Sequence, residues 1–360
     1  MRGLLRRTVV LVALLGLVVT ACGTGSSSAP AAGQPAATVA APVASAAAPA
    51  AAPAATPAVV SDKKITIGAS ASLTWLPLRI AVDRGFFKEA GLTNVGFTLI
   101  DSAPNAASAL AAGELEFAGL AFERAVLATI GGKPVQCVVS IQDTPPSSII
   151  VPAKSDIKPG DWAALKGKTI GVVQGGWSEI VPKYFLTKAG IDLNDVKFTS
   201  TPNTAAQIAA IKSGQVDAVS GIEPSQRQAI FEGFAKMFFD LEDPAVLKQS
   251  WPSPFQATCL QVKTDYAKAN PAVMKAMQQG VARALKEIRA TPTIAVDFAA
   301  KDSPNTNRAI FQQSVNALLN TWSQDGALTE AAIANVSKLL TDYKILPKSL
   351  PYADVVFTGK

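Results

Sequence analysis

In the first third of the folded part, segments whose hydrophobic residues have the spacing of a strand alternate with segments whose hydrophobic residues have the spacing of a helix. Residues 64–69 (KITIGA) alternate apolar and polar positions, and this predicts a strand. Short apolar segments at 95–100, 116–118 and 135–141 predict further strands. Amphipathic helices are predicted between them, one ending near Gly91 and others at 104–112 and 122–130. Strands that alternate with helices predict an α/β fold in which each sheet is mostly parallel.

The same pattern recurs about 100 residues later. KGKTIGVVQGGW (166–177) matches KKITIGASASLTW (63–75), and KSGQVDAVSGIEP (212–224) matches AAGELEFAGLAFE (111–123). The first helix of each half closes with a similar motif, KEAGL or TKAGI, in which Gly is suited to the position after a helix end. Because the matches keep their order, we interpret the chain as two similar lobes.

Two strands are predicted to cross between these lobes. SSIIVPAKSD (147–156) makes a good first crossing, and the strand around 253–263 makes a good return. We therefore expect one lobe at 62–150 plus about 257–360 and the other at 151–256. From Asn270 onward the chain is strongly helical, and Pro271, Pro292 and Pro304 each lie near an expected helix start.

The N-terminus predicts export. Residues 1–21 join a basic start to an apolar run, Thr8–Val19, that is short for a membrane span, so they predict a signal peptide. Val-Thr-Ala-Cys at 19–22 resembles the bacterial lipobox, which implies lipidation of Cys22; the alternative is an ordinary secretory signal. Residues 22–61, rich in Ala and Pro, predict a disordered tether. We expect an extracytoplasmic domain, lipid-anchored to the bacterial cell membrane.

Composition excludes several kinds of chemistry. The chain has no His and three Cys, so a Ser-His-Asp triad, a Cys-His pair and a His-ligated metal site are all excluded. Removal of the signal leaves 30 Lys+Arg against 27 Asp+Glu, a net charge of +3. No basic run supports nucleic-acid binding. We expect no metal, no cofactor and no catalytic residues.

Five motifs taken in order resemble one family. They are PLRIAVDRGFFKEAGL (77–92), GELEFAGL (113–120), DWAALKGKTIGV (161–172), TAAQIAAIKSGQVDAVSGIEP (204–224) and NPAVMKAMQQGVARAL (270–285). The chain thereby resembles, over about residues 64–290, the solute-binding proteins of ABC importers of the nitrate/sulfonate/taurine type. The resemblance implies a type II periplasmic-binding-protein fold, with two lobes on a hinge and the ligand in the cleft between them.

The resemblance also implies a function and partners. The related group includes binders of thiamin-precursor pyrimidines and of riboflavin, and its pyrimidine-synthase branch needs Cys and His residues that this chain lacks. We therefore expect a monomeric binding protein, not an enzyme. It would deliver a sulfonate- or taurine-like, or planar pyrimidine-like, solute to an ABC permease and its ATPase. The alternative is a sensing lipoprotein of the same fold that presents its ligand to a signalling partner.

Ligands of open α/β sheets lie beyond the carboxyl ends of the strands. In this chain those ends lead into six loops: Ser70–Leu76, Gly119–Glu123, Gln142–Ser148, Gln174–Ser178, Ser220–Pro224 and Trp251–Phe255. The family's contacts fall in the same loops. We expect ligand contacts at Ser72, Trp75, Leu76, Phe122, Glu123, Ser147, Gln174, Gly175, Gly176, Trp177, Ser178, Glu223 and Trp251.

The aromatic and small residues of these loops each have two interpretations. Trp75 and Trp177 occupy matching positions and would sandwich a planar ligand, or each would cap the core of its own lobe. The Gly pair and Ser178 would present helix N–H groups to an anion, or Ser178 would simply cap the helix. Trp251 would be a wall of the cleft or part of the packing at the hinge.

The charged residues favour an organic ligand. Glu123 and Glu223 would accept from an amine or a ring N–H, or they would only complement a helix dipole. No Lys or Arg occurs in the six loops, and Arg79 and Arg124 are expected within helices. This favours an aromatic or amine-bearing ligand over an inorganic anion.

Cys137 and Cys259 each lie in a predicted apolar strand. Export makes a disulfide between them feasible. We expect two buried free thiols instead, because the geometry of a cross-strand disulfide is demanding.

Overall fold

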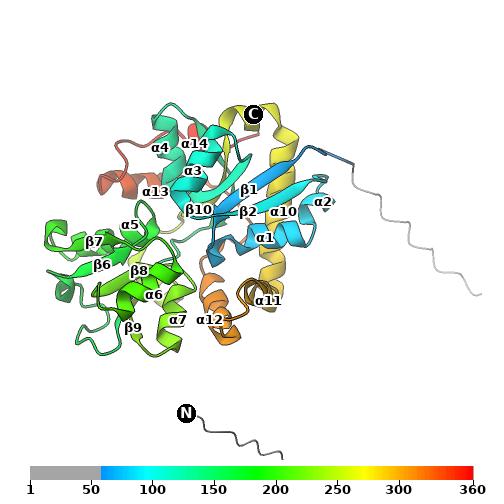
Figure 1. Cartoon of the computed structure of the whole chain (residues 1–360). Helices are drawn as coiled ribbons and strands as arrows, with labels where there is room; N and C mark the ends of the chain where they lie inside the picture. The colour runs from blue at the N-terminus through cyan, green and yellow to red at the C-terminus, as the bar shows by residue number, and fades with distance from the viewer. Residues whose placement is uncertain (1–57, 360) are drawn as a thin grey trace, which may run out of the picture. The chain divides into compact units, whose positions relative to one another are not determined.

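Two five-stranded sheets organise the chain (Figure 1), for which the computed structural model describes residues 58–359. The first sheet has the order β2 (Val95–Ile100), β1 (Ile65–Ser70), β3 (Phe117–Ala121), β10 (Thr258–Lys263), β4 (Val135–Gln142). The second has the order β7 (Lys197–Ser200), β6 (Thr169–Val172), β8 (Ala218–Gly221), β5 (Ser148–Pro152), β9 (Ala235–Asp240). The two orders are equivalent, so the repeated sequence pattern corresponds to a repeated sheet.

Each sheet combines parallel strands with one antiparallel strand. β1 pairs in parallel with β2 and β3, and β6 with β7 and β8. β10 is antiparallel to both β3 and β4, and β5 to both β8 and β9. β5 and β10 are the two expected crossing strands, and each is inserted at the fourth place of the sheet it enters. The lobe boundaries near 150 and 256 stay a prediction.

The helices around the first sheet follow the predicted pattern with one difference. They are α1 (Leu76–Asp83), α2 (Phe86–Glu89), α3 (Ala103–Ala112) and α4 (Phe122–Ile130). The single helix expected to end near Gly91 is divided into α1 and α2. Gly85, at φ 72°, interrupts it, because a residue in the left-handed region cannot continue an α-helix. The Gly residues of KEAGL and TKAGI, Gly91 and Gly190, both have positive φ, as expected after a helix end.

The remaining helices cover the second sheet and form the C-terminal region. The second sheet carries α5 (Trp177–Lys188), α6 (Thr204–Lys212), α7 (Ser225–Phe231) and α8 (Pro244–Ser250). The C-terminal helices are α9 (Thr264–Ala269), α10 (Pro271–Ala290), α11 (Thr293–Asp302), α12 (Arg308–Leu318), α13 (Glu330–Asp342) and α14 (Tyr352–Val355). The predicted helical tail is confirmed. α12 contacts α7, which belongs to the second sheet, and the 3₁₀ turn Leu73–Trp75, which follows the first strand of the first sheet.

Two large hydrophobic clusters pack around the first sheet, and one of them also includes residues of the second half. One cluster packs α1, α10, α11 and α12 on the first sheet. A second joins strand residues such as Leu120 to Trp177 and Phe185 of α5, to Trp251, and to Ile333 of α13. Helix α5 of the second half is thus packed into the core that the first sheet begins.

The expectation of free thiols at Cys137 and Cys259 is wrong. The two residues form a disulfide between β4 and β10. The ladder between these strands shifts register twice, and the two Cα atoms lie 5.6 Å apart, within the range that a disulfide spans. The sequence showed two apolar strands but not this irregular register.

Several N-terminal predictions lie outside the described residues. These are the signal peptide, the lipidated Cys22, and the tether up to residue 57. From Val60 the chain is attached to the folded part, since the Val60 and Ser61 N–H groups donate to the Gly91 carbonyl. Over residues 58–359, no helix has the length and apolar character needed to cross a membrane.

Candidate functional site

Loops from the two sheets meet where the inner strands end. After β1 and β8, the Leu73 N–H donates to the Glu223 carbonyl at 3.5 Å. Between β4 and β5, the Ser147 hydroxyl lies 3.1 Å from the Ser220 hydroxyl at the end of β8. These contacts bring together loops that are about 75 to 150 residues apart in the sequence. We call the region between these loops the inter-sheet cleft.

Arg124 makes a hydrogen bond across this cleft through its guanidinium group. It lies in the first turn of α4, and its Nη2 donates to the Gly175 carbonyl at 2.6 Å. Gly175 has φ 66°, and a Cβ there would lie 2.5 Å from Arg124 Nη2. Its N–H donates to Glu179 at 2.7 Å, so the loop before α5 is held by its own helix. The positive φ favours glycine here, and the guanidinium, at the end of a flexible side chain, would have to shift to make room for a Cβ.

One cavity in this region is lined by both halves. We call it the cleft hollow; its volume is about 390 Å³, a size that suits a small molecule. Its lining comes from the loop after β1, from α1 and β2, from the start of α6, from α7 and the residue before it, and from α11, α12 and the segment between them: Ala71, Ser72, Leu73, Arg79, Leu99, Thr204, Pro224, Gln228, Ala299, Asp302, Ser303, Thr306 and Phe311. Of the residues expected to contact ligand, Ser72 lies here, and it also accepts from the Thr74 N–H at the start of the 3₁₀ turn.

The two matching tryptophans belong to different hydrophobic clusters. Trp75 is packed with α1 and α10, and its Nε1 donates to Ser70. Trp177 meets Trp251 and Phe255 edge-on at ring-centroid distances of 6.2 and 5.5 Å, and its Nε1 donates to the Ala257 carbonyl at 2.8 Å. Both indoles are buried and hydrogen-bonded. Trp75 thus lies in the core of its own lobe, as in the second interpretation. Trp177 packs instead into the cluster that joins α5 to the first sheet.

The loop Gln174–Ser178 keeps an open backbone. Gln174 and Gly175 are exposed, and Gly176 is the N-cap of α5 with no side-chain cap bond. Ser178 does not cap the helix; its hydroxyl accepts from the Val173 N–H at 2.7 Å and donates back to the Val173 carbonyl. Ser178 and Glu179 of α5 thus bond back to the loop, at Val173 and Gly175.

Glu123 is buried at the start of α4. Its side chain is 2% exposed, and within the described residues neither carboxylate oxygen has a hydrogen-bond partner. Burial raises its pKa to about 7, although the charge of Arg124, 3.9 Å away, works in the opposite direction. Near neutral pH this carboxyl group is therefore half protonated and can either donate or accept a hydrogen bond.

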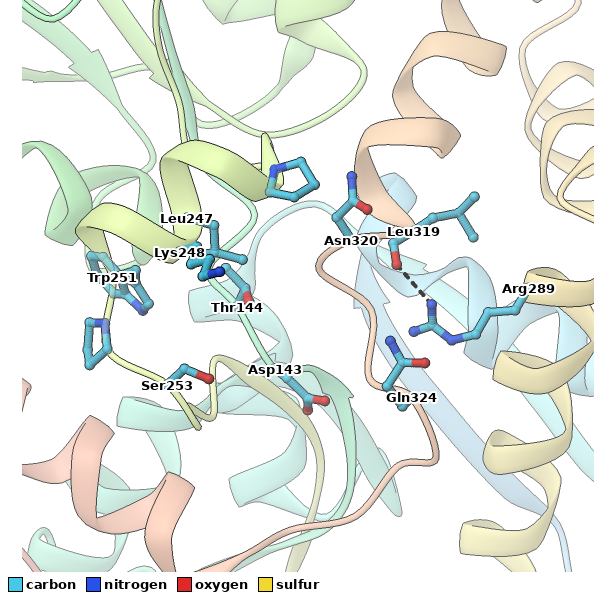
Figure 2. A pocket seen from close by; sticks show the side chains of 12 residues that line it. Asp143, Thr144, Leu247, Lys248, Trp251, Ser253, Arg289, Leu319, Asn320 and Gln324 are labelled. Carbon is cyan, nitrogen blue, oxygen red and sulfur yellow. Dashed lines mark hydrogen bonds between the residues drawn. The ribbon is translucent and has the colours of Figure 1, made fainter.

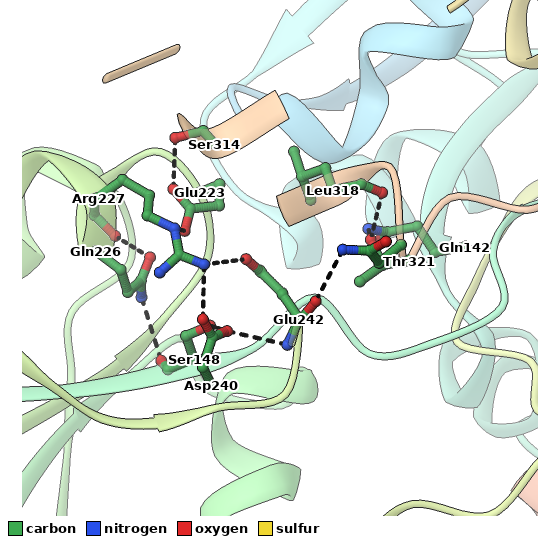
Figure 3. A network of polar contacts seen from close by, with 12 residues as sticks. Gln142, Ser148, Glu223, Gln226, Arg227, Asp240, Glu242, Ser314, Leu318 and Thr321 are labelled. Carbon is green, nitrogen blue, oxygen red and sulfur yellow. Dashed lines mark hydrogen bonds and ion pairs between the residues drawn. The ribbon is translucent and has the colours of Figure 1, made fainter. Parts of the chain in front are cut away.

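Glu223 belongs to a polar network around Arg227 (Figure 3). Its carboxylate lies 3.5 Å from Arg227 Nε and accepts from the Ser314 hydroxyl at 2.6 Å. Arg227 Nη2 also contacts Asp240 at 2.9 Å and Glu242 at 3.5 Å. Ser314 lies on α12, so the network links α7 and β9 of the second half to a C-terminal helix.

Three carboxylates thus surround one guanidinium. Burial lowers the pKa of Arg227, but the charges of Glu223, Glu242 and Asp240 outweigh this and raise it. Burial, reinforced by the nearby Glu223, raises the pKa of Glu242 well above its usual range. The cluster therefore holds a proton on a carboxyl group, and the Nε and Nη2 groups of Arg227 are both directed at carboxylates of this network.

The other expected site residues lie in the core or near the hinge. Leu76 and Phe122 are completely buried. Trp251 lines a second cavity, of about 580 Å³, together with Asp143 and Thr144 of the first crossing segment (Figure 2). We call this cavity the hinge hollow, because segments that connect the two sheets line it on two sides.

Sequence reasoning gave too little weight to Arg124. It was expected close to the loops but within a helix. It does lie in α4, in the first turn, and its long side chain reaches the second half. Its position directly after Glu123, at the start of a helix that follows an inner strand, was the available signal. The cleft therefore contains a cation that the six loops lack.

Comparisons with known proteins agree with this architecture. A family model described as NMT1/THI5 like matches residues 74–295. The candidate binding protein YtlA of Bacillus subtilis is 23% identical over 290 residues, which cover 79% of this chain and 84% of YtlA. A solved structure from Bordetella bronchiseptica superposes with a TM-score of 0.69 at 26% identity and covers 81% of this chain and 92% of its own.

A further solved structure shows the same fold. It is the alkanesulfonate-binding protein SsuA of Xanthomonas axonopodis bound to MOPS, with a TM-score of 0.69 at 19% identity, covering 82% of this chain and 99% of SsuA. The two sheets and their crossing strands are thus those of the periplasmic-binding-protein fold. The match to the family model covers more than half of the sequence, and the chain belongs to the NMT1/THI5-like family.

Proposed function

We propose that this protein is the extracytoplasmic solute-binding lipoprotein of an ABC importer, and that it captures a small organic solute between its two sheets for delivery to a permease. The observation that carries the proposal is the meeting of loops from the two halves across the cleft, where Arg124 reaches Gly175. A solute held there would touch both halves and would stabilise the arrangement in which they meet. No chemical step on the solute is proposed.

The cleft residues favour a sulfonate- or taurine-like solute over a planar one. Arg124 brings a guanidinium, and the uncapped backbone before α5 adds N–H donors, so an anionic head group would find partners. Glu123 directly precedes Arg124 and would accept from an amine. The burial of Trp75 and Trp177 removes the two flat surfaces that a planar ligand would need.

A thermal-unfolding panel on the full chain tests the proposal. It would contain alkanesulfonates, taurine, nitrate, bicarbonate, aromatic carboxylates and sulfonates, thiamin-related pyrimidines and riboflavin. A solute at 100 times its dissociation constant stabilises a protein by about 2.7 kcal/mol. We expect the alkanesulfonates or taurine to raise the unfolding temperature, with a smaller rise in Arg124→Gln and an unchanged rise in the control Arg283→Gln, on the exposed side of α10.

Two measurements together would contradict the proposed binding function. A chain that no solute stabilises, and that native mass spectrometry shows to be free of bound small molecules, would contradict the binding function. The lipid anchor needs its own measurement: the wild-type protein should partition with membranes and Cys22→Ser should not. An unlipidated wild-type Cys22 would leave the solute-binding role intact and refute only the anchor.

A further inference from the structure

A pair of carboxyl groups is buried where α7 and β9 meet α12. Glu223 lies two residues before α7, Glu242 lies two residues after β9, and their side chains are 0% and 1% exposed. Within the described residues, one oxygen of each group, Glu223 Oε1 and Glu242 Oε1, has no hydrogen-bond partner. The two carboxyl groups are close enough to hydrogen-bond to each other. A single proton shared by the pair would therefore satisfy both oxygens.

The charges around the pair do not balance. Arg227 Nη2 lies 2.9 Å from Asp240 and 3.5 Å from Glu242, and Arg227 Nε lies 3.5 Å from the carboxylate before α7, that of Glu223. Over residues 58–359, no other Lys or Arg nitrogen lies within 4.0 Å of these three carboxylates. Three ionised carboxylates around one guanidinium would leave buried negative charge uncompensated, which is costly. Burial is accordingly the main cause that raises the pKa of Glu223 and of Glu242, although Arg227 opposes it.

The elements packed against the pair from the first half bring neutral groups to it. α12 brings the Ser314 hydroxyl, which donates to the Glu223 carboxylate at 2.6 Å. The segment after α12 brings Asn320, whose Nδ2 donates to the Glu242 carbonyl at 3.3 Å. The 3₁₀ turn after β1 brings the Leu73 N–H, which lies 3.5 Å from the Glu223 carbonyl. These groups cover the pair and bond to it, but they do not neutralise its charge.

The pair lies between two separate hydrophobic clusters. α12 contributes Phe311, Val315 and Leu318 to the cluster around the first sheet. α7 contributes Ala229, and β9 contributes Ala235, to a different cluster on the second sheet. No common apolar cluster therefore joins these residues of α12 to those of α7 and β9, and the polar groups around the pair bridge the two sides. If α12 moved away from α7, water would reach both carboxyl groups.

We propose that Glu223 and Glu242 form a proton-binding site, and that their one shared proton belongs to the arrangement in which α12 is packed on α7 (Figure 3). When the two helices separate, both carboxyl groups become hydrated and the proton is released to water. The packed arrangement thus binds one proton more than the separated one. It is favoured at low pH, and this stabilisation is lost as the pH rises. The inference does not depend on which solute the inter-sheet cleft binds.

Distance measurements by electron paramagnetic resonance on the full chain, between pH 5 and pH 10, test the site. Spin labels on Gln313→Cys of α12 and Phe231→Cys of α7, both exposed positions, report the separation of the two helices. Cys22→Ser removes the one cysteine outside the disulfide. Glu242→Gln keeps the shape of the pair but cannot titrate. Glu123→Gln is the matched control, because it removes another buried carboxyl group with a raised pKa that lies outside this network.

The labelled chain without further substitutions should show a short distance at pH 5 and a growing population at a longer distance as the pH rises. Once the shared proton is lost, the ratio of the two populations should change about tenfold per pH unit. Infrared spectra should show a protonated carboxyl band that disappears over the same pH range and that Glu242→Gln lacks. Glu242→Gln should keep the short distance up to pH 10, and Glu123→Gln should respond as the parent chain does.

Three results would overturn the proposal. The first is a distance in the parent chain that stays the same from pH 5 to pH 10. The second is a pH response that Glu123→Gln abolishes and Glu242→Gln retains. The third is a carboxyl band of the pair that persists after the distance has lengthened. If Glu242→Gln does not fold, Glu223→Gln takes its place, because it also removes the shared proton and should flatten the pH response.

Discussion

Glu123 and Glu223 occupy equivalent places in the two halves, yet their surroundings differ. Each follows the strand at the third place in the spatial order of its sheet, β3 or β8, and lies at the start of the next helix. Both are buried. Glu223 has Arg227 and Ser314 as partners, whereas within the described residues Glu123 has no hydrogen bond to its carboxylate. Burial raises the pKa of both carboxyl groups. The repeated fold thus determines where each carboxyl group stands and buries it, and the neighbouring elements determine its bonding partners.

Glu223 and Glu123 therefore differ in how many of their carboxylate oxygens remain available for a hydrogen bond. The partners of Glu223 come from its own helix and from α12, which has no counterpart in the first half. A group so fully bonded serves to hold α7 against α12. Glu123 has unused bonding capacity beside the inter-sheet cleft, and that is the property a ligand contact needs.

Arg227→Met should have the largest effect on stability. It leaves Glu223, Asp240 and Glu242 without their common cation, and breaking a buried ion pair in this way costs about 3–5 kcal/mol. We expect that decrease in the free energy of unfolding measured with urea. The control, Arg283→Met, removes an exposed arginine paired with Glu89 and should cost less than about 1 kcal/mol. Equal losses in both variants would show that the buried network contributes nothing special.

Glu123→Gln should change how stability depends on pH. The unfolded carboxyl has a pKa near 4.5 and the folded one about 7, raised by burial. A raised pKa stabilises the fold below pH 4.5, and that contribution is lost as pH rises to 7. Wild type should therefore lose about 3 kcal/mol more than Glu123→Gln between pH 4.5 and pH 8.

The matched variant for this prediction is Glu223→Gln. It weakens the contacts with Arg227 and Ser314, so it should destabilise the protein at pH 8 where Glu123→Gln stabilises it. Urea unfolding at several pH values between 4.5 and 8 would measure both. Burial raises the pKa of Glu223 as well, so both variants should reduce the pH dependence. The contrast between the two glutamates is wrong if Glu223→Gln is as stable as Glu123→Gln at pH 8.

Ser314→Ala should have a smaller effect. It removes the hydroxyl that donates to Glu223 from α12, and the loss of a hydrogen bond to a buried charged group costs about 1–3 kcal/mol. A double-mutant cycle with Glu223→Gln should show coupling of about 0.5 kcal/mol or more. Additive effects would mean that α12 is held against α7 by packing alone.

Arg124→Gln should affect stability least. Its contact with Gly175 is a single hydrogen bond at a half-exposed position, so the free energy of unfolding should fall by no more than about 1 kcal/mol. Its effect should appear instead in solute affinity, measured by calorimetry with the solute that stabilises wild type. A large loss of stability with unchanged affinity would make Arg124 a structural residue.

Much of the fold was predictable from the sequence, because it depends on short-range patterns. Alternation at 64–69 and 95–100, the Gly residues after helix ends, and the proline-marked helices of the tail are all local signals. The order of the motifs also predicted two crossing strands. Gly85 was missed as a helix break, since one Gly within an amphipathic run is tolerated in many helices.

The candidate site was less predictable. The sequence located the loops, but it could not show whether Trp177 faces the cleft or Trp251 and Phe255. It placed Arg124 in a helix without showing the reach of its side chain. It named Glu123 and Glu223 as alike, although one lacks the partners that the other has.

The sequence by itself determined the α/β architecture with its two similar halves and the loops that follow the inner strands, because hydrophobic periods and helix-end signals act over a few residues. Only the tertiary structure decided the Cys137–Cys259 disulfide, the burial of both tryptophans, the Arg124–Gly175 contact and the network around Arg227. Each of these depends on strand register or on side chains more than 12 residues apart that approach within a few ångströms, or, for Arg227, on the C-terminal helix that packs against its network. Such distances are set by how whole elements pack, and no local pattern in the sequence contains them.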